Sequence, residues 1–123
     1  MSNAIIFVRF TFTGLHNWPG AVYPDAHLSD PHEHLFGVEV GVPVEHDDRE
    51  ITFESLERDA RACIPTAPQH DRYDLGSWSC EHLARHIASC LSEQHQRTVS
   101  VAVDEDARRG ARVTLNAATE PAP

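Results

Sequence analysis

The stretch "DPHEHLFGVEV" (residues 30–40) contains two histidines, His32 and His34, separated by one residue, and continues as an alternating apolar run. Successive residues of a β-strand point to opposite faces of a sheet, so His32 and His34 project side by side. The alternation extends over residues 34–45, which predicts a long antiparallel-type strand. Its apolar face comprises Phe36, Val38, Val40, Val42 and Val44, and Glu39 and Glu45 lie on the other face.

The rest of the chain supplies further strands and helices. The stretch "AIIFVRFTFT" (residues 4–13) alternates and predicts a strand, whereas residues 14–25 are rich in Gly and Pro and predict a loop. Apolar residues at helical spacing predict amphipathic helices over residues 53–64 and 80–95, with Thr52 and Ser79 as N-caps. Short strands are predicted at residues 98–103 and 111–115, and residues 65–77 are predicted as loop.

This order, ββααββ, predicts an α+β fold with a four-stranded antiparallel sheet and two helices on one face. We expect a single domain over residues 1–116 and a flexible tail over residues 117–123. A sheet of this size leaves one face and both edges without partners, so we expect a homo-oligomer.

Composition restricts the function. The formal net charge of −9 disfavours nucleic-acid binding, and the absence of lysine excludes Schiff-base chemistry and a P-loop lysine. No apolar run is long enough to span a membrane and the N-terminus lacks a basic leader region, so we expect a cytoplasmic protein. Cys63, Cys80 and Cys90 form no C-x-x-C pair, which argues against a disulfide framework or a cysteine-rich zinc site.

The histidines favour a metal site. If residues 4–13 and 34–45 pair as a hairpin, the loop carrying His16 lies beside His32 and His34. Three imidazoles with an open fourth position form a catalytic zinc arrangement, although iron, copper and nickel also bind nitrogen. Since nine histidines occur in 123 residues, an H-x-H pair can also arise by chance.

Five motifs in order extend the interpretation: "FTFTGLH", "HEHLFGVEVGV", "TFESL", "SCEHLA" and "VAVDE". Together they resemble the 6-pyruvoyltetrahydropterin and 6-carboxytetrahydropterin synthase family over roughly residues 5–115. The resemblance implies the tunnelling fold (T-fold), in which trimers close their sheets into a barrel and often stack as hexamers, with active sites at subunit interfaces. It also implies a zinc-dependent lyase that acts on dihydroneopterin triphosphate in pterin or 7-deazaguanine (queuosine) biosynthesis.

The resemblance implies roles for individual residues. His16, His32 and His34 would bind Zn²⁺. Glu105 would anchor the pterin, because one carboxylate can accept two adjacent donors, with Asp104 as the competing candidate. Glu81, together with Cys80, would support the edge of the pterin ring.

The sequence departs from the family where a catalytic cysteine is usual. That place falls in "DAHLSD" (residues 25–30), where His27, Asp25 or Asp30 could act as the base. The usual Asp-His pair is altered too: His70 follows Gln69 and could be oriented by Asp71 or Asp74.

Two further roles stay open. Cys80 is another candidate base, because a thiol at a helix N-terminus has a lowered pKa. Triphosphate contacts could come from Arg72, Arg85, Arg108 or Arg109.

Overall fold

A computed structural model describes residues 3–117. Its elements are β1 (Ile5–His16), a 3-10 helix η1 (Ala26–Ser29), β2 (His32–Pro43), α1 (Phe53–Ala62), β3 (Arg72–Asp74), α2 (Cys80–His95), β4 (Val99–Glu105) and β5 (Arg109–Leu115). The predicted tail lies outside the described residues except for Ala117. None of the described helices is both long and apolar enough to cross a membrane.

The sheet has five strands in the order β3-β1-β2-β4-β5, one more than the sequence predicted. The additional strand, β3, was predicted as loop. It lies at the edge of the sheet and pairs in parallel with residues 13–15 of β1, whereas the pairs β1–β2, β2–β4 and β4–β5 are antiparallel. Its three residues are too few to show an alternating pattern, and contact with β1 holds them in place. The ring of Tyr73 in β3 packs edge-on against Phe12 at 4.9 Å between centroids.

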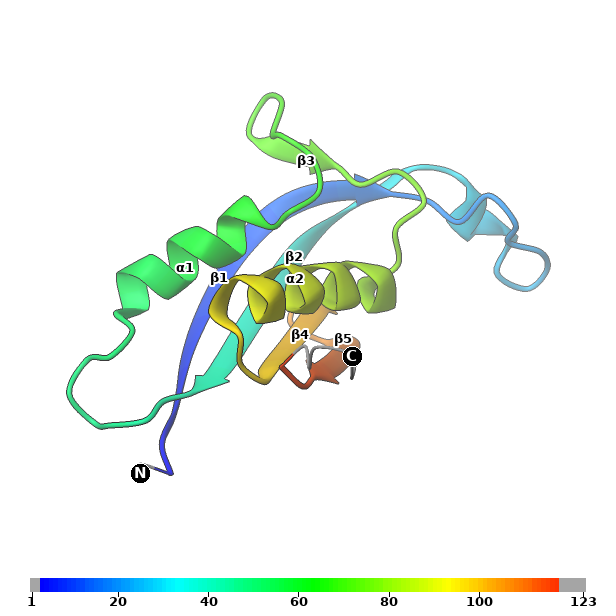
Figure 1. Cartoon of the computed structure of the whole chain (residues 1–123). Helices are drawn as coiled ribbons and strands as arrows, with labels where there is room; N and C mark the ends of the chain where they lie inside the picture. Colours follow the sequence, from blue (N-terminus) through cyan, green and yellow to red (C-terminus); the bar gives the residue numbers. More distant parts are fainter. Residues whose placement is uncertain (1–2, 118–123) are drawn as a thin grey trace, which may run out of the picture.

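One face of the sheet carries the core, and both helices cover that face (Figure 1). The predicted apolar residues of β2 are buried there, with exposures of 1% for Phe36 and 0% for Val40. The predicted N-caps are confirmed, because the side chains of Thr52 and Ser79 accept hydrogen bonds from the backbone N–H groups of Ser55 and His82. The α+β class with two helices on one face is therefore confirmed.

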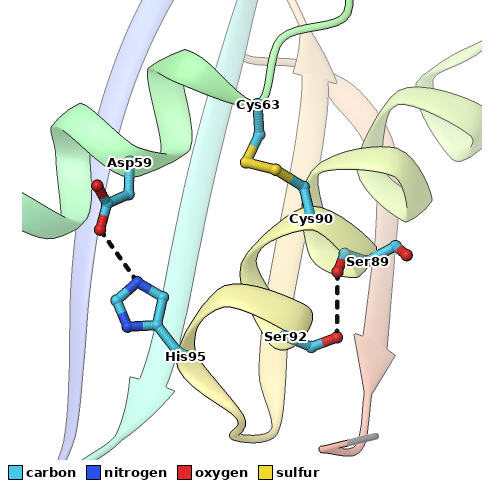
Figure 2. Close-up of a disulfide and its surroundings, with 6 residues drawn as sticks. All are labelled: Asp59, Cys63, Ser89, Cys90, Ser92 and His95. Carbon is cyan, nitrogen blue, oxygen red and sulfur yellow. Dashed lines mark hydrogen bonds and ion pairs between the residues drawn. A yellow bond between two sulfur atoms is a disulfide. The ribbon is translucent and has the colours of Figure 1, made fainter.

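The argument against a disulfide framework missed one bond, because Cys63 and Cys90 are joined with a Cα–Cα distance of 6.0 Å. Cys63 follows the last turn of α1 and Cys90 lies on α2 (Figure 2). The two helices also share an ion pair, in which His95 Nε2 lies 3.1 Å from Asp59 Oδ2. The cysteines are 27 residues apart in sequence, so only the packing of the helices makes them neighbours.

A bidentate ion pair joins the segment before α1 to the segment after α2. Arg97 donates to both carboxylate oxygens of Glu50, at 2.9 and 2.7 Å, and also to the carbonyl of Pro43 at 3.0 Å. The bonds from Arg97, and the one from the backbone N–H of Glu45, lower the pKa of Glu50 from 4.5 to about 2. The pair therefore contributes stability that is complete above pH 4.5 and is lost as the pH falls toward 2.

We expect Glu50→Gln to lower the free energy of unfolding at neutral pH and to flatten its decline in acid. Urea unfolding followed by circular dichroism at several pH values measures both effects. The matched change Glu57→Gln, in an exposed pair with Arg61, should leave the acid dependence in place. An unchanged decline in Glu50→Gln would contradict this assignment.

Candidate metal centre

Strand pairing brings the three histidines together at one end of the sheet. In the β1–β2 ladder, His16 stands opposite His32 and Gly14 stands opposite His34. The ring centroid of His16 lies 4.5 Å from that of His32 and 5.4 Å from that of His34, and the centroids of His32 and His34 are 5.0 Å apart. Because side chains alternate along a strand, His32 and His34 lie on the same face of β2 as its buried apolar residues, and β1 supplies the third ring.

Glu105 joins this group from the end of β4. It follows the buried Val101 and Val103 on the same face of the sheet. Its Oε2 atom lies 3.0 Å from His16 Nε2 and 3.5 Å from His34 Nε2. One ligand atom from each of these four residues lies within 4.8 Å of all the others. We call His16, His32, His34 and Glu105 the histidine cluster.

Hydrogen bonds behind the rings fix which nitrogen faces inward. His16 Nδ1 lies 2.9 Å from the carbonyl oxygen of Trp78, and His32 Nδ1 lies 2.9 Å from that of Asp30. A carbonyl oxygen can only accept, so Nδ1 carries the proton in both rings and Nε2 keeps its lone pair. The Nδ1 atom of His34 lies 2.7 Å from Asp106 Oδ2. All three rings are thus backed by acceptors in the way that metal-binding histidines are.

The inward nitrogen of His16 shows that a cation fits here. Within residues 3–117, His16 Nε2 is buried and has no hydrogen-bond partner. Its proximity to Glu105 does not satisfy it in the neutral ring, because a lone pair then faces a carboxylate. A cation between them would interact favourably with both groups, and three imidazoles with an open fourth position are a suitable donor set for Zn²⁺. The residues present therefore fit a zinc ion.

Aromatic rings pack against the core side of the histidine cluster. The Phe36 ring centroid is 5.2 Å from that of His16 and 5.8 Å from that of His34. This close approach needs glycine at position 14, since a Cβ there would lie 2.9 Å from the Phe36 ring. Phe12 stacks on the same ring at 5.5 Å. The core side of the cluster is therefore apolar.

On its outer side, the cluster opens into a cavity of about 840 Å³. Besides the cluster, titratable side chains reach it from several segments: Asp25, His27, Glu81, His82 and Arg109. The candidate bases His27 and Asp25 thus line the same cavity as the histidines. Within residues 3–117, Arg109 is the one candidate phosphate-binding arginine of the four that lines this cavity.

The structure does not bring His70 and Asp71 to this cavity within one chain. Both are exposed and have positive φ angles of 52° and 62°, in the turn before β3. Asp104, the alternative to Glu105, points to the opposite face of the sheet, where it lines a separate pocket with Arg9 and Arg112. Of the two acids, only Glu105 lies in the histidine cluster.

Cys80 lies beside the cluster, and the expectation of a lowered pKa is wrong. Burial raises the pKa of its thiol to about 12, and the charges of Glu105, Glu81 and Asp104 act in the same direction. It lines a small pocket together with His16 and Glu105 rather than the large cavity. Burial and these neighbouring carboxylates thus act against the ionised thiolate that a helix N-terminus favours.

The sequence interpretation missed Asp106 and the carbonyl groups of Trp78 and Asp30, which orient the rings. Hydrogen bonds from His34 and from the backbone N–H of Leu35 lower the pKa of Asp106. A signal for Asp106 existed, because it follows Glu105 directly at the end of a strand. Using that signal required the pairing of β2 with β4, which places this end beside His34 and Leu35.

Comparison with known proteins supports the fold. No model of a protein family matches the sequence, and no curated protein matches it either. Among solved structures, the chain is similar to a Plasmodium vivax 6-pyruvoyltetrahydropterin synthase carrying a substitution of a catalytic glutamate, with a TM-score of 0.65, 15% identity and coverage of 92% of this chain and 98% of that one. A second P. vivax structure of the enzyme gives a TM-score of 0.60, 14% identity and coverage of 93% and 99%.

The same enzyme from Plasmodium falciparum gives a TM-score of 0.60, 15% identity and coverage of 92% and 98%. Since these matches extend over nearly the whole of both chains, they apply to the entire described architecture rather than to one motif. The chain therefore has the α+β tunnelling fold seen in the 6-pyruvoyltetrahydropterin synthases.

Proposed function

We propose that the protein is a zinc-dependent lyase that converts dihydroneopterin triphosphate into a pyruvoyl- or carboxy-tetrahydropterin, for pterin or 7-deazaguanine biosynthesis. The observation that supports it best is the inward direction of the imidazole Nε2 atoms in a fold shared with 6-pyruvoyltetrahydropterin synthases. Bound zinc would lower the pKa of the hydroxyl groups on the substrate side chain. The residues of this chain must then bind the pterin and move the proton.

Proton transfer is assigned to residues 25–27, where the usual cysteine is absent. Asp25 and His27 both line the cavity, and either could accept a proton from a group bound at the cluster. The P. vivax 6-pyruvoyltetrahydropterin synthase supports a carboxylate in such a role, because the residue replaced in that structure is a catalytic glutamate. A pH–rate profile of Asp25→Asn and His27→Gln would distinguish the two bases.

Glu105 is proposed to accept hydrogen bonds from the pterin, and Arg109 is proposed to contact the phosphates. These two side chains lie within reach of each other, with 3.9 Å between Arg109 Nε and Glu105 Oε1. His70 and Asp71 would act only if a second copy of the chain brought them to the cavity, as a trimer or hexamer of the tunnelling fold would allow. In that case a subunit carrying His70→Ala should be rescued by one carrying Asp25→Asn in mixed assemblies.

The direct test supplies dihydroneopterin triphosphate to metal-replete protein and follows the products by liquid chromatography and mass spectrometry. We expect release of triphosphate, with loss of two side-chain carbons as well if the carboxy product forms, and we expect Glu105→Gln to reduce turnover while the bound zinc remains. Stoichiometric zinc without any turnover would contradict the activity. Loss of zinc in Glu105→Gln would show that Glu105 is a metal ligand instead.

A second candidate is a tunnelling-fold enzyme that acts on another heterocycle. Within the described residues, Arg109 is the one arginine that lines the cavity, and a triphosphate would be expected to bind more cationic side chains than one. This favours the second candidate. Thermal shifts measured with a series of pterins and purines separate the two candidates. Stabilisation by a purine but not by a pterin would favour the second.

A further inference from the structure

Asp106 connects the β4–β5 turn to the histidine cluster. Its Oδ1 atom accepts a hydrogen bond of 2.9 Å from the backbone N–H of Leu35, and its own N–H donates to the Leu35 carbonyl at 2.7 Å. Its other oxygen, Oδ2, lies 2.7 Å from His34 Nδ1. Its φ of 56° is a conformation that aspartate tolerates better than most residues. Two hydrogen bonds with Leu35, one to the carboxylate and one from the backbone, therefore hold Asp106 in place besides its contact with the histidine.

We propose that Asp106 is a positioning residue that keeps the proton of His34 on Nδ1, so that Nε2 faces the histidine cluster with a free lone pair. The inference rests on the proposed metal site for its consequence, but the position of the proton can be measured without metal. An ionised carboxylate only accepts hydrogen bonds, so the contact at 2.7 Å requires Nδ1–H.

His34 is the one ring of the three whose Nδ1 faces a side chain, although Glu105 Oε2 also lies near His16 Nε2, at 3.0 Å. His16 and His32 donate to main-chain carbonyl groups, which no substitution removes. At His34, however, two carboxylates compete for the ring proton: Asp106 Oδ2 at 2.7 Å from Nδ1, and Glu105 Oε2 at 3.5 Å from Nε2. If Glu105 attracted the proton, Nε2 would become a donor and could not bind a metal. The shorter contact with Asp106 decides the competition in favour of Nδ1–H.

Asparagine at position 106 provides a sharp test, because it preserves the shape and reverses one polarity. The amide oxygen can still accept from the Leu35 N–H, which turns the NH₂ group toward His34 Nδ1. A donor there demands an acceptor on the ring, so the proton moves to Nε2. The reverse orientation of the amide would set its NH₂ against the Leu35 N–H, two donors facing each other.

The experiment uses the full-length protein and two measurements. Nitrogen-15 NMR of the imidazole rings, on metal-free protein, reports the tautomer of His34. Competition with a chromogenic chelator reports the zinc affinity. We expect the Nδ1–H form in the wild type, the Nε2–H form in Asp106→Asn, and a zinc affinity about 10- to 100-fold lower in the variant.

Asp104→Asn is the matched control for charge. Asp104 lies two residues away, and its Oδ1 accepts from the backbone N–H of Ala107 in the same turn, but its side chain points to the opposite face of the sheet. It should leave both the tautomer and the zinc affinity as they are in the wild type. Equal losses of affinity in the two variants would overturn the inference, because charge alone would then explain them.

The remaining outcomes also support or overturn the inference about Asp106. An unchanged tautomer in Asp106→Asn would show that Asp106 only holds the turn, and would overturn the inference. A changed tautomer in a protein that binds no zinc would support the inference and reject the proposed function. If Asp106→Asn does not fold, Asp106→Ala gives the same decision: a fall in the Nδ1–H population supports the inference, and an unchanged population overturns it.

Discussion

Replacing His32 with alanine should remove zinc from the purified protein. The ring of His32 is one of three imidazoles whose centroids lie 4.5–5.4 Å apart, and its Nδ1–H is already bound to the Asp30 carbonyl. Its Nε2 therefore has no role in the hydrogen bonding of the backbone. Loss of this ring should act on the metal and leave the strand pairing of β2 in place.

The expected effect is large. Zinc binding in small protein sites amounts to about 10 kcal/mol at the lower end, so one of three nitrogen ligands represents about 3 kcal/mol, or at least a hundredfold in affinity. Zinc that binds only the folded state also raises its stability, by about 2.7 kcal/mol at a hundredfold excess over the dissociation constant. Added zinc should thus raise the melting temperature of the wild type and have little effect on His32→Ala.

Metal content by plasma mass spectrometry and melting temperature with and without zinc measure this prediction. His46→Ala is the control, because His46 is exposed in the loop before α1 and its ring accepts a hydrogen bond from Asp48 within that loop. It should retain the metal and the thermal response of the wild type. Equal zinc content in His32→Ala and the wild type would place the ion elsewhere on the chain.

Removing the disulfide with Cys63→Ala and Cys90→Ala together should lower the free energy of unfolding by about 3–4 kcal/mol. The bond closes a loop with a sequence separation of 27 residues, and opening it restores conformational entropy to the unfolded chain. The loop contains β3 and the start of α2, and its residues Ser77, Trp78, Ser79, Glu81 and His82 line the cavity. The loss is a large part of the stability of a domain of this size.

Denaturant unfolding with and without a reducing agent tests the role of the bond. Reduction should shift the wild-type midpoint down to that of the double variant, and it should not shift the double variant itself. Mass spectrometry of alkylated protein counts free thiols and should find that of Cys80 alone in the oxidised wild type. A midpoint insensitive to reduction, with all three thiols free, would show that the bond does not form.

Much of the fold follows from local patterns. The structure confirms the alternation in β1 and β2 and the caps at Thr52 and Ser79, each of which depends on residues that are close together in the sequence. β3 could not be predicted, since its three residues become a strand only by pairing with β1. The disulfide was missed for a related reason, because the approach of two helices sets its geometry. Disulfides are rare in cytosolic proteins, so this bond and the expected cytoplasmic location point in opposite directions.

The candidate site divides in the same way. His32 and His34 are adjacent by strand period alone, and the hairpin prediction placed His16 beside them. Asp106 and the ring-orienting carbonyl groups depend on contacts between distant segments, which spacing does not reveal. The raised pKa of Cys80 likewise depends on its burial and on the acids that the fold gathers around it, opposite to the effect expected from its place on a helix.

Anomalous diffraction at the zinc edge, from crystals of metal-replete protein, would locate the ion itself. We expect one strong peak per chain, at about 2.0–2.1 Å from the Nε2 atoms of His16, His32 and His34. A peak bonded to Nδ1 atoms, a peak at another site, or the absence of any peak in protein that retains its fold would contradict the account.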